Sequence, residues 1–157
     1  MLRPMPRASI ASPPFRYDDA DPEGFRSGMF RGGFGAKLSG ASVYDIPPGQ
    51  AVCPYHYEYG EEEWLIVLEG TASLRTPEGT EPMGPMELAF FPTGPEGAHL
   101  VRNDTDQPLR VLMFSNVQHP NATVYPDSDK VGVWTGIEDE DRMLERSKHV
   151  GYFHGEA

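Results

Sequence analysis

The sequence predicts an all-β protein made of short antiparallel strands, arranged as a sandwich or a barrel. Turn-forming residues are abundant, with 17 glycines and 16 prolines among 157 residues, which is well above average usage. Between them lie about nine β-branched and aromatic runs of strand length, at the spacing of about 8 to 12 residues that such folds show. A hydrophobic content of 38%, with 11% aromatic residues, is sufficient for a core.

An irregular arm is expected at the N-terminus. Residues 1–35 are rich in proline, glycine and arginine and have little periodic apolar pattern, so we expect short strand pieces at most. We expect this arm to wrap around the domain or around a partner subunit.

The barrel itself is expected over residues 36–135. Here β-branched and aromatic runs alternate with turn residues such as Pro47-Pro48-Gly49, which is the pattern of strands joined by tight turns. Thr76–Gly79 is typical of a hairpin connection. The run Trp64–Leu68 is apolar at every position and predicts a strand buried on both faces. The expected strands are 41–46, 52–58, 63–68, 71–75, 87–91, 98–102, 109–115, 122–125 and 130–134.

Residues 136–157 are expected to form a C-terminal tail. Within it, residues 137–147 have a weakly helical pattern, because Glu138 precedes Arg142 by four residues. The last aromatic residues are too apolar to remain free, so we expect this end to dock on the body or to cover a pocket entrance. The residues concerned are His149, Tyr152, Phe153 and His154.

Charge and composition argue against several classes of partner. The formal net charge is -11, with 13 Lys and Arg against 24 Asp and Glu, and an acidic surface of this size repels phosphate backbones and anionic lipids. We therefore expect no nucleic-acid partner. The longest apolar run spans only residues 64–68, far below the ~20 residues of a membrane span, so no membrane association is expected.

The expected compartment is the cytoplasm. Prolines and arginines interrupt Met1–Phe15, where a signal peptide requires an unbroken apolar segment. The single cysteine, Cys53, excludes an internal disulfide and a thiolate-rich zinc or iron–sulfur site. Both features are compatible with a soluble protein in a reducing compartment.

The segment Gly49–Gly70 carries the residues with the clearest chemistry. On a regular strand His56 and Glu58 point to the same face, and Glu63 at the start of the next strand can reach back toward them. A later turn-rich segment leads to His99, a second imidazole. Two imidazoles and two carboxylates suit a divalent first-row metal ion. The same residue types are often ordinary surface groups in acidic proteins, so spacing alone leaves both interpretations open.

Strand parity also makes a prediction for the cysteine. Cys53 differs in parity from His56, so on a regular strand it faces the opposite side and is a core thiol rather than a nucleophile. A bulge at Pro54 would remove the basis of this prediction.

These residues resemble the two sequence motifs of the cupin superfamily. The first motif is glycine, five residues, His-x-His, three or four residues, Glu, six residues and glycine. It corresponds here to Gly49, His56, Glu58, Glu63 and Gly70, with six residues rather than five between Gly49 and His56. The second is glycine, five residues, Pro-x-Gly, two residues, His, three residues and Asn. It corresponds to Gly84, Pro92, Gly94, His99 and Asn103, with seven residues before Pro92 and a loop before His99 that is two residues longer than in the motif. With the segment 125–134, the whole pattern resembles small single-domain bacterial cupins.

The resemblance implies a double-stranded β-helix, the jelly-roll barrel of cupins, with one metal site inside one end. Carried over by motif, the ligands are His56, Glu63 and His99, while Glu58 stands where the motif has its second histidine. Glu58 is therefore expected either as a fourth, acidic ligand or as a catalytic base beside the ion. The distance to Gly70 favours Glu63 as the ligand, and a shift of one residue would select Glu62.

The implied ion is manganese, iron(II) or zinc. The expected function is a metal-binding protein that acts on a small oxygenated organic molecule by dioxygenation, isomerisation or decarboxylation. The alternatives are a non-catalytic cupin that binds or senses a small ligand, with or without metal, and a structural partner of another chain. Because small cupins commonly pair through their sheets, the resemblance also implies a homodimer.

Overall fold

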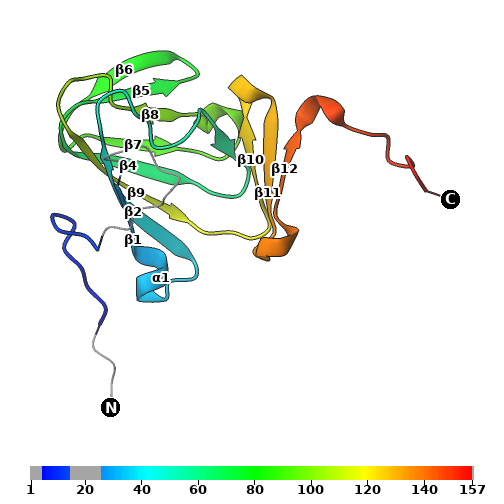
Figure 1. Ribbon diagram of the computed structural model, residues 1–157, viewed down its shortest axis with the longest axis horizontal. Helices are drawn as coiled ribbons and strands as arrows, with labels where there is room; N and C mark the ends of the chain where they lie inside the picture. The colour runs from blue at the N-terminus through cyan, green and yellow to red at the C-terminus, as the bar shows by residue number, and fades with distance from the viewer. Residues whose placement is uncertain (1–4, 15–25, 157) are drawn as a thin grey trace.

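The computed structural model describes residues 5–14 and 26–156, which form strands, turns and very short helices (Figure 1). The predicted all-β class is confirmed. No helix among these residues has the length and apolar character needed to cross a membrane. The strands are β1 (Arg26–Met29), β2 (Ser39–Ile46), β3 (Tyr57–Glu58), β4 (Glu63–Glu69), β5 (Ala72–Thr76), β6 (Gly79–Met83), β7 (Leu88–Phe91), β8 (Leu100–Arg102), β9 (Leu109–Asn116), β10 (Asn121–Tyr125), β11 (Lys130–Trp134) and β12 (Arg142–Glu145). The helical segments are α1 (Phe30–Phe34) and the 3-10 turns η1 (Pro95–Gly97), η2 (Pro126–Ser128), η3 (Glu138–Glu140) and η4 (Arg146–Lys148).

The strands form antiparallel sheets that join distant parts of the chain. A five-stranded sheet has the order β1-β2-β9-β4-β7, a four-stranded sheet the order β12-β11-β10-β3, and a three-stranded sheet the order β6-β5-β8. β2 pairs with β9 along its whole length, from Ser39 opposite Asn116 to Ile46 opposite Leu109. Residues from the two halves of the chain therefore meet within one sheet, and the sheets share an interior.

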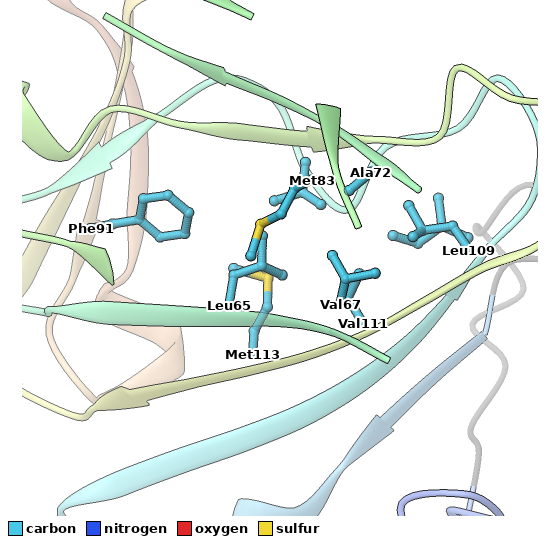
Figure 2. Packing of buried hydrophobic residues seen from close by; sticks show 10 residues of the cluster. Leu65, Val67, Ala72, Met83, Phe91, Leu109, Val111 and Met113 are labelled. Carbon is cyan, nitrogen blue, oxygen red and sulfur yellow. The ribbon is translucent and has the colours of Figure 1, made fainter. Parts of the chain in front are cut away.

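The main core lies between the five-stranded and three-stranded sheets (Figure 2). Along β4, Leu65 and Val67 are fully buried, whereas the alternate residue Trp64 lies on the outer face against Phe90 and Phe114. Within the single chain the outer face of this strand is only partly covered, so burial on both faces would require a second chain there. The other core side chains are Ile46, Ala72, Met83, Phe91, Val101, Leu109, Val111 and Met113.

The segment expected as a strand over residues 52–58 is mostly irregular. The backbone bends through residues 52–55, and pairing is limited to β3 and two isolated bridges, Ala51 with Arg102 and His56 with His99. Pro54 lies within the bend, and proline has no amide hydrogen to donate to a strand ladder. The alternation of faces that the sequence predicts does not hold there.

The hairpin predicted at Thr76–Gly79 is confirmed between β5 and β6. Strand β6, however, has no apolar alternation that predicts it, because four of its five residues are exposed. Its pairing with β5 stabilises it instead.

The two ends of the chain add strands to the sheets. β1 pairs with β2, which agrees with short strand pieces in the arm. Residues 137–147 contain β12 between two 3-10 turns rather than the expected helix, because the edge of β11 offers unpaired backbone groups to which β12 bonds. The following tail leads away from the barrel (Figure 1), with Tyr152 90% and Phe153 79% exposed. The expected docking of this end on the body is therefore wrong for the described chain.

Candidate metal centre

His56 and His99 come from distant parts of the chain and lie opposite each other in an antiparallel bridge. The His56 amide donates to the His99 carbonyl oxygen at 3.1 Å, and the His99 amide donates to the His56 carbonyl oxygen at 2.8 Å. Directly opposed residues of an antiparallel pair project to the same face. Their imidazole rings accordingly lie together, with centroids 4.6 Å apart, and both residues are buried.

Glu63 joins the two histidines from the first position of β4. Its Oε2 lies 3.3 Å from His99 Nε2 and 3.7 Å from His56 Nε2. One ligand atom from each of the three residues lies within 4.8 Å of the other two, and a single metal ion can bridge such a separation. We refer to His56, Glu63 and His99 as the three-residue cluster.

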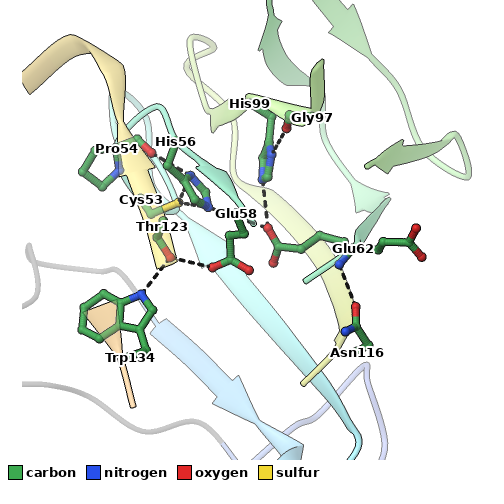
Figure 3. A network of polar contacts seen from close by, with 11 residues as sticks. Cys53, Pro54, His56, Glu58, Glu62, Gly97, His99, Asn116, Thr123 and Trp134 are labelled. Atoms are coloured by element: carbon green, nitrogen blue, oxygen red, sulfur yellow. Dashed lines mark hydrogen bonds and ion pairs between the residues drawn. The ribbon is translucent and has the colours of Figure 1, made fainter. Parts of the chain in front are cut away.

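The two preceding glutamates have other partners. The Glu62 amide donates to Asn116 Oδ1, and the Glu61 carboxylate accepts a hydrogen bond from the Gln118 amide. Figure 3 shows the Glu62 side chain directed away from the histidines. Of the three consecutive glutamates, the structure brings Glu63 to the histidines, as the spacing to Gly70 predicts.

Backbone carbonyl groups determine which nitrogen of each imidazole faces Glu63. His56 Nδ1 lies 2.9 Å from the Pro54 carbonyl oxygen, and His99 Nδ1 lies 2.9 Å from that of Gly97. A carbonyl oxygen can only accept, so each Nδ1 carries a hydrogen and donates it. In a neutral ring this leaves a lone pair on Nε2, which is the usual arrangement of a metal-binding histidine.

Three buried polar atoms of this region have no hydrogen-bond partner. They are Oε2 of Glu58, Oε2 of Glu63 and Nε2 of His99. Buried polar atoms are normally satisfied, and here all three can act as electron-pair donors. The donor set therefore fits a cation.

The protonation states of His56 and Glu63 depend strongly on each other. Burial alone would raise the pKa of Glu63, but the close ion-pair contacts of its carboxylate with His56 and His99 lower it to about 2. Burial alone would lower the pKa of His56, but its contacts with Cys53 and Glu63 raise it to about 10. In the metal-free protein a proton on His56 thus balances the Glu63 carboxylate at neutral pH, and a bound cation would replace that proton.

Glu58 lies beside the cluster and is not one of its three members. Its Oε1 accepts a hydrogen bond from Thr123 Oγ1 at 3.0 Å, and Thr123 in turn accepts one from Trp134 Nε1 at 2.7 Å. Burial, followed by the charge of Glu63, raises the pKa of Glu58 to about 7. Figure 3 shows Glu58 between Thr123 on one side and His99 on the other.

Neither Thr123 nor Trp134 carries a sequence signal that points to the site. They lie on β10 and β11, after the motif residues, and reach Glu58 because β10 pairs with β3. That pairing joins segments whose register no local pattern predicts.

A cavity of about 290 Å³ adjoins the cluster, with His56 and Glu63 in its wall. Cys53 also lines it, and its Sγ lies 3.4 Å from His56 Nδ1. The prediction that Cys53 faces away from His56 as a core thiol is therefore wrong, because the bend at residues 52–55 removes strand alternation. The hydroxyl-bearing residues of the wall are Ser42, Tyr44 and Ser115, and no lysine or arginine is among the described lining residues.

The loop before His99 is held tightly against the neighbouring strand. The Gly94 amide donates to the Glu58 carbonyl oxygen at 2.7 Å. At Gly97 a Cβ atom would collide with the Pro92 carbonyl oxygen, so only glycine fits there. Gly97 therefore lets the loop fold back onto Pro92, while the Gly94 amide ties the loop to β3 beside the bridge between His56 and His99.

The sequence matches the family of cupin domains over residues 42–115. Residues 42–115 are a cupin domain. This stretch includes the whole three-residue cluster, whereas Thr123 and Trp134 follow it. No curated protein matches the sequence.

Solved structures agree with this cupin fold. A sugar phosphate isomerase of the cupin superfamily from Silicibacter pomeroyi superposes with a TM-score of 0.80 and 22% identity, over 94% of this chain and 98% of that chain. A protein from Acidithiobacillus ferrooxidans for which the same activity is proposed superposes with a TM-score of 0.73 and 22% identity, over 81% of this chain and 80% of that chain. A polyketide cyclase from Streptomyces resistomycificus superposes with a TM-score of 0.60 and 24% identity, over 73% of this chain and 80% of that chain. The predicted cupin barrel is confirmed.

Proposed function

We propose that this cupin domain binds one divalent metal ion through His56, Glu63 and His99. The observation that carries the proposal is the buried approach of His99 Nε2 to Glu63 Oε2, 3.3 Å apart, where neither atom has a hydrogen-bond partner. With a neutral His99 ring, two lone pairs face each other at this distance, and a cation between them would attract both. Three protein ligands leave coordination positions for water or a substrate.

The donor set favours manganese, iron(II) or zinc. Two imidazoles and a carboxylate suit these ions, and the cluster contains no thiolate. When bound, such an ion polarises an oxygen atom of a substrate. The carboxylates of Glu63 and Glu58 reduce its positive charge, so it is a weaker Lewis acid than an ion held by three imidazoles.

We propose that the reaction is the isomerisation of a small hydroxy-carbonyl compound. Glu58 offers a buried oxygen without a partner beside the cluster, which suits a group that takes a proton from a substrate and returns it. The hydroxyls of Ser42, Tyr44 and Ser115 in the cavity wall suit a hydroxylated molecule. One protein of similar fold is a sugar phosphate isomerase.

An uncharged substrate is favoured over a phosphorylated one. Phosphate recognition normally uses arginine or lysine, and the described wall of the cavity contains neither. Two glutamates, Glu61 and Glu63, are part of that wall instead.

Metal analysis of protein purified without chelators tests the metal site. We expect about one equivalent of manganese, iron or zinc in the wild type and a loss of this metal in His56→Ala. Glu62→Gln is the matched control, because its side chain points away from the cluster. Equal metal content in the wild type and His56→Ala would contradict the proposal.

Deuterium exchange tests the reaction. With small neutral aldoses or ketoses in D₂O, we expect NMR to detect deuterium next to the carbonyl group with metal-loaded wild type but not with Glu58→Gln. Oxygen consumption would indicate a dioxygenase instead, and carbon dioxide release a decarboxylase. Ligand binding without any of these signals would indicate the non-catalytic alternative.

We also propose that the chain forms a homodimer through the outer face of the five-stranded sheet. On this face Trp64 packs on Phe90 and Phe114, with ring centroids 4.6 and 6.0 Å apart. Leu88 is nevertheless 56% exposed and Phe90 43% exposed. An adjoining set of exposed apolar side chains is typical of a protein contact surface, and a second copy offers the same surface in return.

A further inference from the structure

The Glu58 carboxylate is held from the four-stranded sheet by a chain of two hydrogen bonds. Trp134 Nε1 lies 2.7 Å from Thr123 Oγ1, which lies 3.0 Å from Glu58 Oε1. An indole N–H can only donate, so Thr123 accepts from Trp134 and its own hydrogen is free to be donated to Glu58. Because the indole can only donate, both hydrogen bonds run in one direction, from Trp134 through Thr123 to Glu58.

Strand pairing places these groups in one row. Thr123 lies opposite Glu58 in the pairing of β10 with β3, and opposite Gly132 in the pairing of β10 with β11. Trp134 lies two residues after Gly132, on the same face of β11. A Cβ at Gly132 would lie only 2.5 Å from Trp134 Cζ2. The missing side chain at Gly132 thus leaves the space in which the indole reaches Thr123.

Burial limits the alternative partners of the Thr123 hydroxyl and the Glu58 carboxylate. Thr123 is only 2% exposed, so water cannot readily replace a lost partner of its hydroxyl. With Oε1 of Glu58 bonded to Thr123, the carboxylate has only Oε2 free, and that atom is buried without a partner. Figure 3 shows Thr123 and Trp134 on the side of Glu58 away from His99.

We propose that Thr123 and Trp134 are positioning residues that hold the free oxygen of Glu58 toward the three-residue cluster. The inference rests on the proposed function, because the cluster is taken as the metal site. Held in this way, the negative charge of Glu58 strengthens cation binding, and its free oxygen stays available to a substrate. The match to the cupin family ends at residue 115, so this support comes from a later part of the chain.

Cobalt(II) affinity, measured by calorimetry on metal-free protein, tests the proposal. Thr123→Val removes the hydroxyl at nearly constant shape, Thr123→Ser retains it, and Trp134→Phe removes the indole N–H. We expect Thr123→Val and Glu58→Gln each to weaken binding about tenfold, the scale observed for groups that support metal ligands. Thr123→Ser is expected to bind like the wild type, and Trp134→Phe to change in the direction of Thr123→Val.

Combining substitutions separates positioning from a general structural effect. In a Glu58→Gln protein, Thr123→Val is expected to cause no further loss, since its effect acts through Glu58. Additive losses would overturn the proposal. If Thr123→Val does not fold, Trp134→Phe takes its place in the same comparison.

The outcomes also separate this proposal from the metal site itself. A wild type that binds no cobalt(II) would contradict the metal site, and the positioning role would fall with it. A wild type that binds cobalt(II) no better than Thr123→Val and Trp134→Phe would contradict the positioning role alone.

Discussion

His56 and His99 are joined backbone to backbone, and this pairing brings their imidazoles to one face. The two hydrogen bonds between them involve main-chain atoms only, so they do not depend on either side chain. Removing an imidazole therefore deletes a candidate ligand without deleting the pairing that shapes the site. The candidate metal centre is for this reason accessible to substitution experiments.

Glu63→Gln is expected to lower the affinity for zinc or cobalt(II) by at least about a hundredfold, since it replaces a charged ligand rather than a supporting group. Titration calorimetry on metal-free protein measures the effect. Glu62→Gln, one position earlier, is expected to bind like the wild type because Glu62 lies outside the cluster. An equal loss in both variants would mean that overall charge, not coordination, determines the affinity.

Metal binding is expected to release about one proton at about pH 8. The metal-free His56 has a pKa of about 10 and is protonated at that pH, whereas Glu63, with a pKa of about 2, is already ionised. Calorimetry in two buffers of different ionisation enthalpy counts the protons. Binding without proton release would show that His56 is neutral before the ion arrives.

The metal-free protein is expected to lose stability as pH rises above neutrality. The pKa of His56 rises from 6.5 to about 10 on folding, so its contribution is complete below pH 6.5 and is lost as pH approaches 10. The pKa of Glu63 falls from 4.5 to about 2, so its contribution is complete above pH 4.5 and is lost in acid.

Glu58 makes its own contribution to the pH dependence of stability, and substituting Glu58 isolates that contribution. Its pKa rises from 4.5 to about 7 on folding, so the free energy of unfolding falls as pH rises through this range. Urea unfolding across this range is expected to show a smaller decrease for Glu58→Gln than for the wild type. The decrease above this range, which comes from His56, is expected in both proteins.

Asn103→Ala is expected to reduce the free energy of unfolding by about 3 kcal/mol, because it leaves several buried polar groups unsatisfied. Asn103 is fully buried, and its side chain donates to the carbonyl oxygens of Ile46 and Gln107 and accepts from Thr105. Urea unfolding measures the change. Asp104→Ala, at the neighbouring exposed position, is the control and is expected to have little effect.

Phe90→Asp is expected to convert the proposed dimer to a monomer, because it places a charge in the exposed apolar face of the five-stranded sheet. Sedimentation equilibrium measures the mass. Tyr152→Asp in the C-terminal tail is the control, since that residue is exposed but lies away from the sheet. A monomeric wild type, or dissociation by Tyr152→Asp alone, would contradict the proposed interface.

Local sequence pattern predicts the strands where alternation is strong. Along β9, Leu109, Val111 and Met113 alternate with less buried residues and line the core, so the chain itself shows which side faces inward. β12 shows the opposite case, because all four of its residues are exposed. Its backbone pairing with β11, rather than apolar alternation, makes it a strand.

The sequence by itself determined the all-β class, and its resemblance to the cupin motifs indicated the barrel and singled out His56, Glu63 and His99 as candidate ligands, because both signals lie in the order and spacing of residues along the chain. Only the tertiary structure decided that Cys53 enters the cavity beside His56 and that Thr123 and Trp134 support Glu58. The first depends on a bend of the backbone near Pro54, and the second on the register of β3 with β10. A shift of one residue in such a register exchanges the two faces of a strand, and long-range pairing sets it.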